Sequence, residues 1–253
     1  MRPGRTGGVR DALPVAAGAV LAVALMEAVG RLEVFGGSWP PLSRVLDLLW
    51  VPATRELLVR SLGTTAGEAG IGLLAGTLAA VAVAVLGVLL PVLRAGLDRL
   101  AAVVNAIPLI ALGPLLIAGV GREDSPAVVA ALAVGFVMFV SMTSGLDAAS
   151  GAHHDVLAAL GASRTTTLLR LRLPASVPMA LDGLTQAAPA AVLGAIVGEW
   201  LGAPRGLGTL LVSTMQNHQT LLLWAAGMAA ALLAMASYAV VCALRSQLVW
   251  RFQ

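Results

Sequence analysis

Four stretches of this chain are long enough to cross a lipid bilayer and contain no charged side chain. They are Ile71–Leu93, Leu100–Val120, Pro126–Leu146 and Gln219–Leu244. A helix needs roughly 20 consecutive apolar residues to span the hydrocarbon core of a membrane. Each stretch therefore predicts a transmembrane helix.

Two further stretches raise the number of predicted spans to six. Leu13–Val29 carries a single acid, Glu27, near its end, and Leu173–Gly198 carries a single acid, Asp182, near its start. Three arginines precede Leu13–Val29 within the first ten residues, a pattern that also fits a cleaved signal peptide. Residues 1–30 can therefore be interpreted either as a retained helix or as a cleaved signal peptide.

The composition supports a chain that has lipid as its solvent. Hydrophobic residues make up 58% of the chain and charged residues 11%, whereas about a quarter of a soluble domain is charged. The sequence pI near 10.4 is therefore better explained by arginines at the cytoplasmic membrane face than by nucleic acid binding. A lone cysteine, Cys242, forms no intramolecular disulfide and binds no metal by itself.

All sixteen basic residues are arginine, and the chain contains no lysine. A phosphate-binding Walker loop needs a lysine that reaches the β- and γ-phosphates. The sequence thus predicts a chain that does not hydrolyse ATP by that route.

The arginines also predict the orientation. With the N-terminus inside the cell, ten arginines fall on inner segments and six on outer ones, as the positive-inside rule favours. Four of the outer six lie in residues 31–60, which we interpret as an external amphipathic segment along the membrane surface. Two domains are expected, an N-terminal helix with this segment over 1–60 and a core over 61–248.

Ionisable groups are predicted only near the ends of the spans. Glu27, Glu68 and Glu199 lie at outer ends, and Asp147 and Asp182 at inner ends. Ion-coupled transporters place such groups deep in the membrane, so a secondary transporter or channel is the weaker alternative. Asn105, Gln186 and Glu199 are candidates for the pathway or gate, although interhelical hydrogen bonds would also explain the two amides.

Other residues predict local geometry. The adjacent His153 and His154 point about 100° apart on a helix, so no metal site is expected. Glycine pairs such as Gly63/Gly67 and Gly72/Gly76, four residues apart, predict close helix packing. Pro108, Pro114 and Pro189 lie inside the predicted spans and predict kinks.

The stretch DVLAALGASRTTTLLRLRLP, residues 155–174, interrupts the apolar pattern with a polar loop. Asp155–Leu160 suits a short helix, which Gly161 can end in the left-handed conformation. Ser163 can cap a second helix over Arg164–Leu173, and Pro174 is expected to stop it. On these grounds alone the loop either attracts anionic lipid or inserts a helix into a partner's groove.

This stretch resembles the cytoplasmic motif of permease subunits of bacterial ABC importers, which reads Glu-Ala-Ala, three residues, Gly, nine residues, then Ile-x-Leu-Pro. Here Asp155-Val156-Leu157 stands for Glu-Ala-Ala, Gly161 has the required spacing, and Leu171-Arg172-Leu173-Pro174 follows nine residues later. The segments RSLGTTAGEAGIGLLAGTLAA, NAIPLIALGPLLIAGVG and GEWLGAPRGLGTLL are similar to the nitrate, sulfonate and taurine branch of that family.

The resemblance implies an all-α integral membrane protein of the bacterial cytoplasmic membrane, with about six helices and the type I ABC importer permease fold. It implies a coupling loop at about 147–174 that docks on a separate ATPase. The coupling residues carried over are Asp155, Gly161, Ala162, Ser163, Arg164, Leu171 and Pro174. ATP and Mg would bind the ATPase, and this chain would bind no cofactor.

The implied partners are an extracytoplasmic substrate-binding protein and a second permease copy, a homodimer being expected and a heterodimer possible. The branch implies a small anion such as a sulfonate, taurine or nitrate as solute, with vitamin precursors as an alternative. A membrane scaffold that does not transport anything is a further alternative.

Overall fold

The computed structural model describes residues 12–149 and 151–249, and every regular element in these ranges is helical. This confirms the all-α membrane fold. The N-terminal part comprises α1 (Ala12–Arg31), η1 (Gly36–Ser38), α2 (Leu42–Asp47), η2 (Leu48–Trp50), α3 (Pro52–Leu89), α4 (Pro91–Ala106), η3 (Leu109–Leu112) and α5 (Gly113–Val120). The remainder comprises α6 (Ser125–Asp147), α7 (Gly151–Ala159), α8 (Arg164–Thr167), the π turn η4 (Leu168–Arg172), α9 (Leu173–Trp200), α10 (Leu207–Gln216) and α11 (Thr220–Val249).

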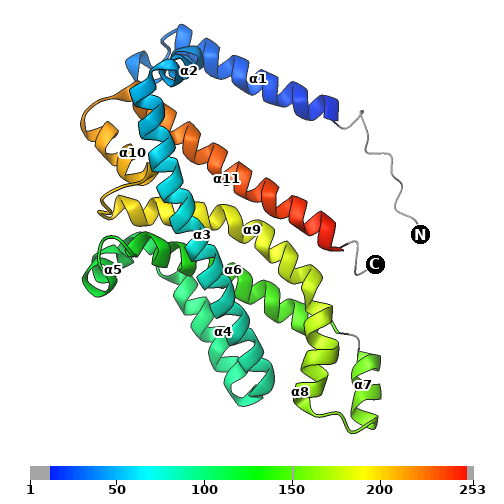
Figure 1. The fold of residues 1–253 in the computed structure, drawn as a ribbon. Coiled ribbons are helices and arrows are strands. Elements are labelled where there is room, and N and C mark those ends of the chain that lie inside the picture. The colour runs from blue at the N-terminus through cyan, green and yellow to red at the C-terminus, as the bar shows by residue number, and fades with distance from the viewer. Residues whose placement is uncertain (1–11, 150, 250–253) are drawn as a thin grey trace.

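The long helices run between two ends of the molecule. In Figure 1, α2, α5 and α10 gather at the left, whereas α7 and α8 lie at the lower right, the side toward which α1 begins and α11 ends. We call the end with α7 and α8 the loop end. Four helical segments in the described ranges are apolar and long enough to cross a membrane: α3, α6, Arg164–Trp200 and Thr220–Leu248.

A further apolar stretch is bent in the middle, as in a broken span or a re-entrant loop. We predicted a single span over Leu100–Val120, and this is wrong: α4 ends at Ala106, and the following η3–α5 segment turns away by 88°. Ile107 has an extended backbone because the residue before a proline, here Pro108, avoids the helical region. Pro114 then starts α5, and α9 continues past Pro189.

The predicted external segment is shorter than residues 31–60. It ends at η2, because Pro52 occupies the first turn of α3, where its missing N–H costs nothing. Arg60 forms an ion pair of 2.6 Å with Glu56 one turn earlier and so belongs to the helix. The predicted domain boundary at residue 60 consequently falls inside α3, which passes through it without a break.

The core is a stack of small residues in which α6 lies between α3 and α9. Ala130 of α6 has no solvent exposure. A Cβ added to Gly72 of α3 would overlap the Ala130 side chain, and one added to Gly194 of α9 would lie 2.7 Å from the Ala130 Cα. The predicted close packing is therefore confirmed for Gly72 and Gly76. It is wrong for Gly63 and Gly67, where an added Cβ meets nothing within 4 Å.

A matched pair of glycines on α3 tests this stack. Gly76→Leu should destabilise the chain by about 1–3 kcal/mol, because its Cβ would lie 2.5 Å from the Ala131 carbonyl oxygen. Gly67→Leu, on the open side of the same helix, should leave stability unchanged. Thermal unfolding of the two variants in detergent measures the difference, and equal melting temperatures would contradict the stack.

Candidate coupling loop and Glu199 clamp

The turn after α7 is built around Gly161. Its φ of +71° is left-handed, which only glycine adopts without strain. The Gly161 N–H donates to the Ala158 carbonyl at 3.0 Å and the Ala162 N–H to the Leu157 carbonyl at 2.9 Å. These two hydrogen bonds form a Schellman motif, so the predicted helix end at Gly161 is confirmed.

The next helix begins as predicted but does not end as predicted. The Ser163 Oγ caps α8 by accepting from the Thr166 N–H at 3.2 Å. We expected Pro174 to stop the helix over Arg164–Leu173, and this is wrong, since one helical segment continues from Arg164 to Trp200. The π turn directly before Pro174 has wider i→i+5 bonding, as in the Leu173 N–H bonded to the Leu168 carbonyl. It accommodates a ring that would clash in an ordinary α-turn.

An apolar face of α7 is left uncovered. Val156 is 58% exposed and Leu160 is 77% exposed, and because they are four residues apart they lie on the same side of the helix axis. Asp155 is exposed as well, and Leu171 is half-buried. At the edge of this region the Arg94 guanidinium pairs with Asp147, which ties the start of α4 to the end of α6. The loop end thus presents a short helix whose apolar side is exposed. The Arg94–Asp147 ion pair next to it holds α4 against α6.

At the opposite end of α9, the carboxylate of Glu199 holds three segments together. Glu199 is 1% exposed. Its Oε1 accepts from the Thr65 hydroxyl at 2.6 Å, and its Oε2 accepts from the Gly208 N–H. The Thr65 oxygen also accepts from the Leu207 N–H at 2.9 Å. We call this arrangement the Glu199 clamp, since it fastens the α9–α10 turn to α3.

Gly206 completes the clamp. Its φ is +123°, and an added Cβ would overlap the Glu199 carboxylate. Any side chain at this position would both strain the backbone and displace the acid. Glu199, named from the sequence as a pathway or gate candidate, is thus placed inside the protein, where its contacts are those of a positioning residue.

Sequence reasoning missed Glu68 as a member of this region. Its side chain interacts with that of Glu199, and its Oε2 is buried without a hydrogen-bond partner among the described residues. Thr65, Glu68 and Gly72 follow the i, i+3, i+7 spacing of one helix face. That spacing was the available signal, because it puts the acid on the same side as the residues that pack against α6 and α9.

The two amide candidates lie on exposed surfaces of the single chain. Asn105 is in the last turn of α4, and Gln186 is near the middle of α9. A polar side chain at membrane depth normally faces a water-filled cavity or other protein and not lipid. Their placement is compatible with a pathway or an interface with a second copy, and their role stays a prediction.

Two neighbouring threonines test the Glu199 clamp. Thr65→Val removes a hydroxyl that donates to Glu199 and accepts from Leu207, so it should cost about 1–3 kcal/mol, the penalty for unsatisfied buried groups. Thr64→Val is the control, because that hydroxyl only bonds back to the Arg60 carbonyl. Thermal unfolding in detergent compares them, and a Thr65→Val protein as stable as Thr64→Val would refute the clamp.

Comparisons with known proteins identify the family. Residues 72–251 match the family described as "Binding-protein-dependent transport system inner membrane component". The chain is 33% identical over 181 residues to a "Probable ABC transporter permease protein" of Haemophilus influenzae, covering 71% of this chain and 70% of that protein. It is 36% identical over 132 residues to the "Formylaminopyrimidine transport permease protein ThiX" of Halalkalibacterium halodurans, covering 49% of this chain and 53% of that protein. The chain therefore belongs to the family of inner membrane components of binding-protein-dependent transport systems, the permease subunits of ABC importers.

Proposed function

We propose that this permease subunit forms the membrane pathway for a small nitrogen heterocycle of the vitamin-precursor class. The support is its similarity to a permease named for formylaminopyrimidine transport. The exposed polar side chains Asn105 and Gln186 are neutral amides, which hydrogen-bond ring nitrogens and amino groups. A sulfonate-like anion, which the sequence resemblance implied, would be bound more strongly by a cationic side chain than by these neutral amides.

The driving force would come from ATPase subunits on separate chains that bind ATP and Mg. The observation that carries this proposal is the uncovered apolar face of α7, held by the Schellman turn at Gly161. An apolar face on a short helix fits a groove in a protein partner. Beyond Ser163 the chain enters α9 without a break, so a displacement of the loop passes directly into the membrane helices.

The topology follows from this docking. The loop end would be cytoplasmic, and α1 would begin and α11 would end on that side (Figure 1). The end with α2, α5 and α10 would then face the extracytoplasmic binding protein. A second copy of the permease would complete the pathway across the exposed surfaces that carry Asn105 and Gln186.

The coupling role predicts the effect of one substitution. Gly161→Val should abolish ATP-driven uptake while the protein still inserts, because valine cannot adopt a φ of +71° cheaply. Gly96→Val is the control, since its added Cβ meets nothing within 4 Å and its φ is not left-handed. Uptake and ATPase co-purification from native membranes are the two measurements. Normal uptake by Gly161→Val would remove the coupling assignment.

The solute class is tested separately, in cells that carry the complete transport system. Uptake of labelled formylaminopyrimidine should depend on this chain, and excess unlabelled taurine should not compete with it. Competition by taurine, together with taurine uptake that disappears when the chain is deleted, would favour the anion. Neither result bears on the coupling test, which measures ATPase attachment directly.

A further inference from the structure

Three arginines line one recess at the loop end of the molecule. The recess has a volume of about 380 Å³ and lies between the α3–α4 turn on one side and α7 and α8 on the other. Arg94, Arg164 and Arg172 supply its polar wall, and Gly87, Val88, Pro91 and Ala158 are among its apolar lining. A volume of this size is within the range of small-ligand pockets, about 300–1,000 Å³.

The recess carries an excess of positive charge. Arg94 is paired with Asp147. Arg164 and Arg172 form no ion pair within residues 12–149 and 151–249, and no acid lines the recess. Guanidinium groups bind phosphate through two parallel hydrogen bonds. The chemistry therefore favours an anion with phosphate-like oxygens.

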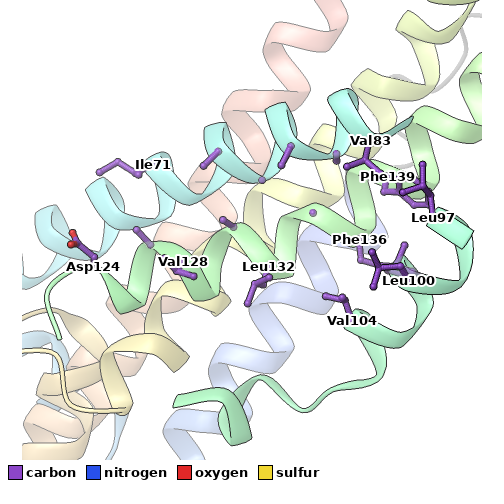
Figure 2. Close-up of a pocket in the computed structure, with 18 residues that line it drawn as sticks. Ile71, Val83, Leu97, Leu100, Val104, Asp124, Val128, Leu132, Phe136 and Phe139 are labelled. Carbon is purple, nitrogen blue, oxygen red and sulfur yellow. The ribbon is translucent and has the colours of Figure 1, made fainter. Parts of the chain in front are cut away.

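A long apolar groove starts beside the recess. It runs between α3, α4 and α6, has a volume of about 640 Å³, and extends from Ile71 and Asp124 at one end to Leu97 and Phe139 at the other (Figure 2). A constriction with a volume of only about 10 Å³ lies between the two spaces, so the recess and the groove adjoin without forming one cavity. The constriction shares Val83, Leu97 and Phe139 with the groove and Gly87, Val88 and Arg94 with the recess, and Asp98 and Asp147 also line it.

The recess lies at the level expected for lipid headgroups. It contacts the last turn of α3, which ends at Leu89, and the start of α4. The part of α3 between Glu68 and Leu89 is about 30 Å long at 1.5 Å per residue, which matches the thickness of the hydrocarbon core. The arginines thus lie at one membrane surface and the groove within the apolar layer.

We propose that this recess and groove form a binding site for an anionic phospholipid, whose phosphate contacts Arg164 and Arg172 and one of whose acyl chains occupies the groove. A free phosphate ion would bind the arginines but would not occupy the apolar groove. Ala162 and Arg164, which line the recess, are among the coupling residues that the family resemblance implies, but an acidic side chain of the ATPase would have to reach the side of α7 opposite its exposed apolar face. Ala158, which lines the recess, points about 160° away from Val156 and Leu160 on the docking face of α7. The site is independent of which solute the permease carries.

The test uses the full-length chain extracted in mild detergent from membranes that contain equal amounts of phosphatidylglycerol and phosphatidylcholine. Native mass spectrometry reports the ratio of the two lipids retained. The wild-type chain should be enriched in phosphatidylglycerol, and the Arg164→Gln/Arg172→Gln variant should lose roughly tenfold of that enrichment. Arg170→Gln is the matched control, because Arg170 lies in the same stretch but does not line the recess.

A second variant probes the groove without touching any charge. Gly135 lines the groove, and a Cβ added there meets nothing within 4 Å, so Gly135→Leu should fill the space and reduce phosphatidylglycerol retention severalfold. Gly70→Leu, an equally open position on α3 outside the groove, should retain the lipid like wild type. Matching melting temperatures for all variants would establish that the losses are not due to misfolding.

Three results would overturn the proposal. Equal losses in the double variant and in Arg170→Gln would mean diffuse surface charge, not a site. Complete displacement of phosphatidylglycerol by millimolar inorganic phosphate, with Gly135→Leu unaffected, would mean a site for free phosphate. A double variant that keeps the lipid but no longer co-purifies with the ATPase would assign the arginines to the protein partner.

Discussion

Close approach of helix backbones is the constraint on which the rest of this structure depends. In a bilayer the lipid is as apolar as leucine, so helices associate through tight packing and not through burial of apolar surface from water. Ala130 shows how this is achieved, with a glycine of α3 on one side and a glycine of α9 on the other. Larger residues at Gly72 or Gly194 would separate the layers, and every other contact would shift with them.

The glycine–alanine stack also explains why the Glu199 clamp can form. Thr65 lies two turns before Gly72 on α3, and Glu199 lies just after Gly198, whose added Cβ would overlap Pro126 of α6. The positions at which α3 and α9 pack along α6 therefore place the Thr65 hydroxyl next to the Glu199 carboxylate. A buried carboxylate is costly unless hydrogen bonds satisfy it, and here a hydroxyl and a backbone N–H do so. The acid in turn sets the path of the chain into α10.

Local signals in the sequence predicted local structure well. The spacing around Gly161 and Ser163 was enough to locate a helix end and a helix start, because Schellman turns and N-caps depend on neighbouring residues only. The same logic failed at Pro174, where a π turn rearranged the hydrogen bonds just ahead of the ring. It fell short at Pro108, where a kink was expected and the helix instead ended.

Features that depend on distant segments could not be predicted. Glu199 and Thr65 are 134 positions apart, and nothing in either neighbourhood indicates the other. The start of α3 was placed too late because the apolar run, and not the proline at residue 52, was used to define the helix. The difference between the two glycine pairs could not be predicted for the same reason. Their spacing is identical, but Gly72 and Gly76 pack against α6 and Gly63 and Gly67 do not.

The unbroken course from Arg164 to Trp200 gives the molecule a mechanical property. A segment of this length measures about 55 Å, and it has the proposed docking loop at one end and Glu199 at the other. In the proposed coupling it would act as a lever, with the contact between α9 and α6 as its fulcrum. A tilt of about 5° applied to one arm displaces the far tip by a few ångströms, roughly the length of a hydrogen bond. Under the proposed coupling, small motions at the loop end would therefore be enough to open or close contacts near Glu199.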